Sequence, residues 1–216
     1  MSNMSMMFKT KCSRQIFSRC SLRLLTLTFV CLSFFSIYMM PSNASGVDSF
    51  PLGISLVAPI QFPFEDSDVE GMRINILYGQ NENVFGLDIG SLINVVNDEL
   101  FGLQIAGLVN TIGSSSGAMQ VAGIGNTCYE SFNGIQIAGI ANKVDENMAG
   151  CQIGCFNIAT NMDGMQIGVY NKAVKANGIQ IGVINKTETM TGIQLGLVNI
   201  ITTSPYSFMP IVNVYF

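Results

Sequence analysis

Hydrophobic and polar residues alternate with a period of two through most of residues 71–201. Stretches such as residues 192–196 place an apolar side chain at every second position, with Gly or Gln between them. This alternation is typical of β-strands that have one buried and one exposed face. Polar segments such as residues 186–191 separate these stretches and predict turns. The pattern therefore predicts an all-β protein.

The alternating stretches are copies of one motif, Gly-x-Gln-Ile-(Gly/Ala)-x-x-Asn, and an extra residue often precedes the Asn. Residues 134–142 are a long copy, residues 178–185 are a short copy, and residues 86–94 are a diverged first copy. Copies begin 16 residues apart from Gly86 onward and 14 residues apart from Gly150 onward. A helix is unfavourable, because most copies carry two Gly residues that each cost about 1 kcal/mol relative to Ala. Tandem repeats of this length indicate a protein built by stacking one unit.

Two architectures use a β-repeat of 14–16 residues. In a β-solenoid each repeat is one coil, the apolar side chains at motif positions two and four stack inward, and the motif Asn residues stack at a corner where their amides bond to one another. In an antiparallel outer-membrane β-barrel each repeat is one strand and one turn. The similar turns at every step favour a β-solenoid-like stack. The alternating C-terminal residues 210–216 resemble the closing strand of a barrel, which stays the alternative.

Residues 1–44 predict a secretory signal peptide. Five basic residues precede residue 24, residues 24–40 are largely apolar, and Pro41-Ser-Asn-Ala44 places small residues where a signal peptidase cleaves. We therefore expect export to the cell surface, the outer membrane or the extracellular space. An uncleaved membrane anchor is the alternative. The exported chain divides into an N-terminal cap with an acidic loop (45–70), a β-repeat domain (71–201) and a C-terminal capping strand (202–216).

Composition excludes several classes of function. The chain has no His, and after Ala44 only five Lys and Arg residues face all 14 Asp and Glu, a net charge of −9. Nucleic acid is excluded as a partner, because binding a polyanion needs clustered cations. His is the commonest general base and metal ligand, so we expect no enzyme activity, catalytic residue, cofactor or metal site. The acidic residues 65–70 lack the spacing of a calcium-binding loop, and a carbohydrate-active β-helix enzyme is a remote alternative by analogy of fold.

Three cysteines follow the predicted leader: Cys128, Cys151 and Cys155. An odd number cannot pair fully within one exported molecule. Cys151 and Cys155 replace apolar motif residues and are expected to be small core side chains. A disulfide between Cys128 and one of them is the alternative, since residues 151 and 155 on one straight strand would lie about 13 Å apart.

A row of glutamines is the candidate interaction face. In a solenoid these side chains recur about every 4.8 Å and form a ladder of amides. Small neighbours, mostly Gly, would leave the row flat and open to a carbohydrate or a cell-surface protein. A ladder that only supports the stack is the structural alternative. The row consists of Gln104, Gln120, Gln136, Gln152, Gln166, Gln180 and Gln194.

The run Gly71-Met-Arg-Ile-Asn-Ile-Leu-Tyr-Gly-Gln-Asn81 and the Gly-x-Gln-Ile-Gly copies after it resemble the surface-repeat proteins of spirochaetes, some of which are lipoproteins. The resemblance extends from about residue 52 to residue 216 and implies a surface or envelope location without implying an activity. Phe29-Val30 before Cys31 lacks the small residue of a lipobox. We expect an exported β-repeat protein with a structural or adhesive role, membrane association remaining open. A small outer-membrane barrel or pore is the alternative function.

Overall fold

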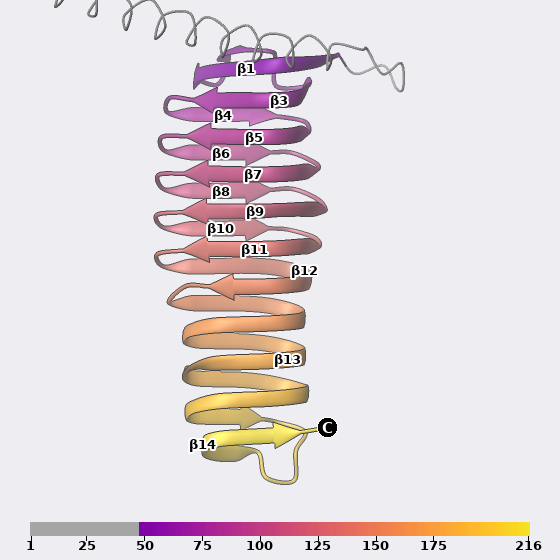
Figure 1. The fold of residues 1–216 in the computed structure, drawn as a ribbon, viewed down its shortest axis with the longest axis vertical. Helices are drawn as coiled ribbons and strands as arrows, with labels where there is room; N and C mark the ends of the chain where they lie inside the picture. The colour runs from indigo at the N-terminus through magenta and orange to yellow at the C-terminus, as the bar shows by residue number, and fades with distance from the viewer. Residues whose placement is uncertain (1–47) are drawn as a thin grey trace, which may run out of the picture. The chain divides into compact units, whose positions relative to one another are not determined.

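The computed structural model describes residues 48–216, which form a stack of β-coils (Figure 1). The predicted signal peptide lies outside the described residues. The strands are β1 (Ser49–Val57), β2 (Ile60–Phe62), β3 (Asp68–Asn75), β4 (Tyr78–Asn81), β5 (Val84–Gly90), β6 (Ile93–Val96), β7 (Leu100–Ala106), β8 (Val109–Ile112), β9 (Ser116–Ala122), β10 (Gly125–Cys128), β11 (Phe132–Ala138), β12 (Ala141–Ile153), β13 (Phe156–Ile201) and β14 (Phe208–Tyr215).

Successive coils pair in parallel, each repeat lying directly on the one before it. β3, β5, β7, β9 and β11 lie side by side and form what we call the wide wall, while β4, β6, β8 and β10 form the opposite narrow wall. β12 and β13 continue both walls. Asn126 of β10 pairs with Asn110 before it and Asn142 after it. The predicted solenoid is confirmed, and the antiparallel barrel is wrong, because the pairs between coils are parallel.

The residues that point inward and outward on the wide wall are the reverse of those predicted. All seven glutamines of the candidate row are buried with 0% of their surface exposed. Ile135 and Ile181, at motif positions two and four, are 41% and 38% exposed. The apolar motif residues therefore point outward. The predictions of an inward isoleucine ladder and of an open glutamine face are both wrong.

The narrow interior explains why the polar side faces inward. A coil of 14 to 16 residues brings its two walls close together, and the Nε2 of Gln194 on the wide wall lies 3.3 Å from the Oγ1 of Thr187 on the narrow wall. Only small residues and planar side chains fit in the half of the coil that holds the glutamines and asparagines of the motif. Gly168 shows how tight it is, because a Cβ there would lie 2.6 Å from the Nδ2 of the ladder residue Asn157.

Two ladders of side-chain amides connect the coils, so the predicted stacking of both rows is confirmed. The Nε2 of Gln152 donates to the Oε1 of Gln136, one coil earlier, at 2.8 Å. The Nδ2 of Asn142 donates to the Oδ1 of Asn157, one coil later, at 2.9 Å, and to the carbonyl oxygen of Ile153 at 2.9 Å. The same bonds recur in neighbouring coils. The buried amides are thereby satisfied from coil to coil.

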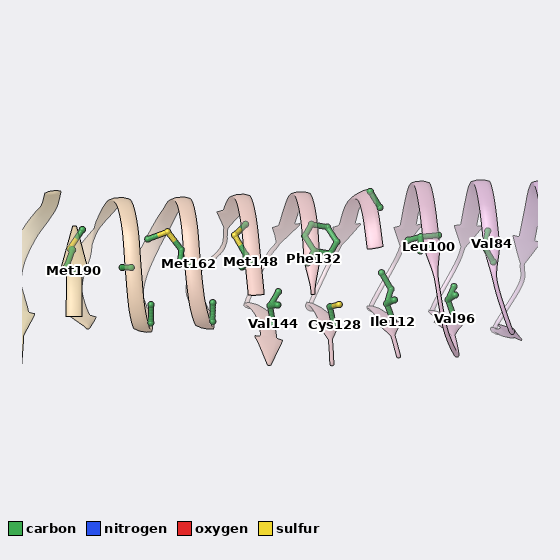
Figure 2. Packing of buried hydrophobic residues seen from close by; sticks show 14 of the residues in the cluster. Val84, Val96, Leu100, Ile112, Cys128, Phe132, Val144, Met148, Met162 and Met190 are labelled. Carbon is green, nitrogen blue, oxygen red and sulfur yellow. The ribbon is translucent and has the colours of Figure 1, made fainter. Parts of the chain in front are cut away.

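The apolar core fills the other half of the interior as two facing rows (Figure 2). Neighbouring side chains compensate in size: Ser116 lies between Leu100 and Phe132 in one row, and the smaller Ala159 follows Val144 in the other, where the coils become shorter. The wide-wall row comprises Val69, Val84, Leu100, Phe132, Met148, Met162, Ala176 and Met190, and the narrow-wall row comprises Val96, Ile112, Cys128, Val144, Ala159, Ala173 and Ile201.

An ion pair replaces glutamine in the first coils of the stack. Arg73 and Asp88 occupy the two places before Gln104 in the same register. The Nε and Nη2 of Arg73 donate to the two carboxylate oxygens of Asp88 at 2.8 and 2.6 Å, and the Nε2 of Gln104 donates to Asp88 Oδ2 at 2.8 Å. Both charged side chains are buried. Asp88 is thus the acceptor at which the glutamine ladder ends.

Antiparallel strands close both ends of the described stack. β2 lies antiparallel to β1 in the segment predicted as the N-terminal cap, and β14 lies antiparallel to the last coil (Figure 1). In β14, Pro210 lacks an N–H donor and Ile211 has a φ of +71°. Both features interrupt the regular edge that another strand would need for pairing. Since core, ladders and caps all belong to the compact unit Gly46–Phe216, we treat this unit as able to fold on its own.

Deleting one complete coil is expected to leave a folded protein. Removal of residues 164–177 joins Asp163 to Gly178 and keeps every interior row in register, because Gly164 and Gly178 occupy the same place in successive repeats. Removal of residues 164–170 instead shifts the two walls against each other and exchanges inward and outward side chains. Circular dichroism and urea denaturation should show cooperative unfolding only for the longer deletion, and equal behaviour of the two would contradict the coil boundaries.

Candidate interaction surfaces

The glutamine row does not form a surface. Its side chains are buried, and those within the stack both donate and accept amide hydrogen bonds, as Gln166 does with Gln152 and Gln180. A partner that approaches the side of the solenoid meets the outward residues instead. Candidate interaction sites therefore lie among the outward residues of the two walls and the two corners.

The outer surface of the wide wall is apolar along the whole stack. The residues at motif positions two and four are uncharged in every coil, and the column from Met72 to Ile193 extends about 38 Å at roughly 4.8 Å per coil. One column is Met72, Leu87, Leu103, Met119, Ile135, Cys151, Met165, Ile179 and Ile193, and the other is Ile74, Ile89, Ile105, Val121, Ile137, Ile153, Ile167, Ile181 and Leu195. Most of these side chains are half-buried or exposed. An apolar surface this long is unusual for a monomeric soluble protein.

An apolar groove follows the corner at which the wide wall turns into the narrow wall, and we call it the glycine corner. Gly154, Gly168 and Gly182 lie along the groove between outward aliphatic side chains such as Ile167 and Val169, and its volume is about 580 Å³. A second hollow of about 410 Å³ shares Gly182 and Val183 and continues the groove toward β14. The glycine corner therefore extends the apolar surface of the wide wall.

Most charged residues lie away from the two apolar columns, and the exposed Glu70 and Asp163 lie at the edge of the wide wall, two residues before Met72 and Met165. Lys143, Lys172 and Lys186 each directly follow an asparagine of the ladder, so they share one outward column on the narrow wall. The acidic residues gather at the opposite corner, which we call the polar corner, and include Glu82, Asp98, Glu99, Glu130, Asp145, Glu146 and Glu188. Lys143 and Asp145 form an exposed ion pair at 2.7 Å. The cross-section thus has an apolar side, a cationic column and an acidic corner, in that order.

A second groove, of about 710 Å³, lies along the polar corner in the 14-residue coils, and we call it the polar groove. The Nδ2 of Asn161 donates to the Oδ1 of Asn147 at 2.9 Å, and the Nδ2 of Asn177 donates to the Oδ1 of Asp163 at 3.2 Å. Tyr215 of β14 lines its C-terminal end. The other lining residues are Met148, Ala149, Met162, Lys175, Ala176, Thr189, Met190, Thr191 and Thr203. Its polar part consists of amides, hydroxyls and one pair of opposite charges, Asp163 and Lys175.

The three cysteines of the described chain are free thiols, so the alternative of a disulfide is wrong. Cys128 is the inward residue: its Sγ donates to the carbonyl oxygen of Ser114 at 3.1 Å, and burial raises the pKa of its thiol to about 11. Cys151 is half-buried and Cys155 is exposed at the glycine corner. The prediction that Cys151 and Cys155 are core residues is wrong, because the motif residues that they replace point outward.

Neither a metal-binding cluster nor a spanning helix occurs in the described part of the chain. Within residues 48–216, no three His, Cys, Asp or Glu side chains lie together as ligands for an ion, and this includes the acidic residues 65–70. The same residues contain no helix that could cross a membrane. Comparison of the chain with family models, with curated proteins and with solved structures gives no match.

Proposed function

We propose that this chain is an exported, non-catalytic protein of the cell envelope that lies on a lipid surface through its wide wall and has a structural or adhesive role. The observation that carries the proposal is the uncharged apolar surface of the wide wall, about 38 Å long. Leaving so much apolar area in water is unfavourable, and large exposed patches mark protein or membrane contacts. The predicted signal peptide and the resemblance to surface-repeat proteins support the location.

Three features favour a lipid surface over a second copy of the chain. The glycine corner adds a narrow apolar groove along the stack, of a shape suited to acyl chains. Lys172 and Lys186 follow the groove residues Val169 and Val183 by three positions on the narrow wall, and their long side chains can extend toward anionic headgroups, whereas the ammonium of Lys143 pairs with Asp145. The acidic residues lie at the opposite corner, away from these headgroups. A protein partner would need no such order of charges.

The role follows from which side stays exposed. When the wide wall and the glycine corner lie on lipid, the polar corner faces away from the surface, and the rigid stack presents it as one continuous edge. Repeat proteins commonly use such extended edges for binding. We therefore propose a display role.

Vesicle flotation tests the lipid contact. The unit Gly46–Phe216 should float with vesicles of phosphatidylcholine and phosphatidylglycerol, and the double variant Ile135→Glu/Ile181→Glu should float much less. Each half-exposed isoleucine contributes about 1 kcal/mol on burial, so the pair changes the partition coefficient by roughly 30-fold.

The matched control adds the same two charges at the polar corner. Thr160→Glu/Thr189→Glu carries both new carboxylates on exposed threonines away from the wide wall and should float like the parent. Equal loss of flotation in both variants would assign the effect to net charge and contradict the proposal. So would a stable dimer in the absence of lipid, measured by light scattering, that only the isoleucine variant disrupts, because the wide wall would then bind a second copy.

A further inference from the structure

We infer that the polar groove binds an uncharged glycan chain that lies along the solenoid axis. This inference rests on the proposed function, since it names what the exposed polar corner would bind. The groove lies along the part of this corner that shortens, from the coil of Asn147 to the coil of Thr203. Three residues, 145–147, make this corner in one coil, and two residues, Thr160 and Asn161, make it in the next. The two outward columns that contain Asn161 and Asp163 lie on either side of the inward Met162 and form the rims of the groove.

The composition of the groove matches the chemistry of a sugar. Sugar hydroxyls both donate and accept hydrogen bonds, and side-chain amides and hydroxyls do the same. Asn161 and Asn177 each use one N–H within the rim, toward Asn147 and Asp163. Their second N–H and their Oδ1 form no bond within residues 48–216, so each amide still offers one donor and one acceptor. Such pairs can hold adjacent hydroxyls of one sugar ring.

The floor and the far end of the groove are less polar than its rims. Met148, Met162 and Met190 lie beneath the rims, and Tyr215 closes the C-terminal end with a ring that is 38% exposed. The C–H face of a pyranose packs on such a ring and on apolar backbone, while its edge hydroxyls reach the rims. A volume of about 710 Å³ lies in the range of sites for small ligands and short oligomers.

The charges of the groove favour an uncharged ligand. Asp163 and Lys175 are its only ionised lining residues, and their charges cancel. The polar corner around it is acidic, with Asp145, Glu146 and Glu188 nearby in sequence. An anionic glycan would be repelled by this corner, and a polycation would find one carboxylate inside the groove. The repeat of the rims at each coil also suits a ligand that is itself a regular chain.

Affinity electrophoresis in native gels tests the inference with defined probes. Hydroxyethyl cellulose and dextran serve as neutral polysaccharides, alginate as an anionic one and gelatin as an extended polypeptide. We expect at least one neutral polysaccharide, and neither alginate nor gelatin, to retard the unit Gly46–Phe216. Retardation by gelatin would assign the groove to polypeptide, retardation by alginate would contradict the charge argument, and migration unaffected by either neutral polysaccharide would overturn the inference.

Substitutions at the rim locate the site. Asn161→Ala/Asn177→Ala removes two amides that each offer a free donor and a free acceptor, and it should raise the apparent Kd at least about tenfold, since two lost hydrogen bonds already predict that change. Tyr215→Ala should weaken binding and Tyr215→Phe should not, if the ring acts as a platform. Asn133→Ala is the matched control, because Asn133 holds the same repeat position as Asn177 in a coil outside the groove. An equal effect of Asn133→Ala would overturn the assignment.

Failure of the inference and failure of the lipid contact are distinguishable. The rim variants should float with vesicles like the parent, and Ile135→Glu/Ile181→Glu should be retarded by polysaccharide like the parent. Flotation without retardation would overturn the glycan site alone. Retardation without flotation would overturn the lipid contact and leave the glycan site in place.

Discussion

Replacement of Gln152 by Glu is expected to lower the free energy of unfolding at pH 7 by about 3–5 kcal/mol. The Nε2 of Gln152 donates to Gln136, and its Oε1 accepts from Gln166, both at 2.8 Å. A carboxylate keeps the acceptor but loses the donor, so two oxygens would face each other inside the stack. The buried charge would have no counterion among the neighbouring amides. Urea denaturation followed by circular dichroism measures the loss.

The loss should be smaller in acid. Burial of the new carboxyl raises its pKa in the folded state above the unfolded value of about 4.3, so the folded variant binds the proton more tightly. The stability that the protonated group provides is present in full below about pH 4.3 and is lost as the pH rises through the folded-state pKa. A protonated carboxyl can also donate to Gln136 as the amide does. A difference from the parent that does not depend on pH would contradict burial of the side chain.

The next residue provides the control. Ile153 is 38% exposed on the outer surface of the wide wall, so Ile153→Glu should cost at most about 1 kcal/mol, as most surface substitutions do. Gln152→Glu should therefore lower the free energy of unfolding far more than Ile153→Glu. The reverse order would mean that the hydrophobic residues of the motif face the core.

The buried ion pair should show strong coupling between its two residues. Asp88→Gln alone leaves the guanidinium of Arg73 buried without its carboxylate and is expected to cost about 3–5 kcal/mol. The double variant Arg73→Gln/Asp88→Gln should recover part of this loss, because two more glutamines can continue the ladder from Gln104. The bonds that Arg73 donates to Asn81 and to the carbonyl oxygen of Val95 are still lost. A double-mutant cycle built on urea denaturation gives the coupling free energy.

The exposed ion pair of Lys143 and Asp145 serves as the comparison. Both side chains are well exposed and 2.7 Å apart, and Asp145→Asn should change stability by less than about 1 kcal/mol. Additive effects of the Arg73 and Asp88 substitutions would show that the two residues do not act as a pair. The expected contrast between the two ion pairs comes from burial and from the two hydrogen bonds that Arg73 donates to Asp88, since the contact distances are similar.

The repeat period predicts the coil, the parallel stacking and the amide ladders, but alternation alone does not predict which side is inside. Alternation shows only that two faces differ, and the usual preference for a hydrophobic interior assigned them wrongly here. A second signal was present in the copies. The third position is Gln from Gln104 to Gln194, whereas positions two and four vary among Met, Leu, Ile, Val and Cys. A hydrogen-bonded ladder demands one side chain, while an outward surface tolerates several.

The two grooves depend on changes too small to predict from the motif. The period shortens from 16 to 14 residues because each corner loses one residue: the ladder spacing from Asn142 to Asn157 is 15, and that from Asn157 to Asn171 is 14. The repeat spacing shows that two residues are lost, but it does not show at which corner each is lost. The structure places one lost residue at the glycine corner and the other at the polar corner, where Val144 to Asn147 pairs with Ala159 to Asn161.

The opposite directions of the two amide ladders have an electrostatic consequence. Each glutamine donates toward the N-terminal coils, and each asparagine donates toward the C-terminal coils, so their dipoles oppose each other along the axis. In an α-helix aligned dipoles add up to about half a charge at each end. Here the side-chain contributions cancel within every coil, and no end charge accumulates as coils are added. The number of repeats is therefore free to change by whole units while the same two caps close the stack.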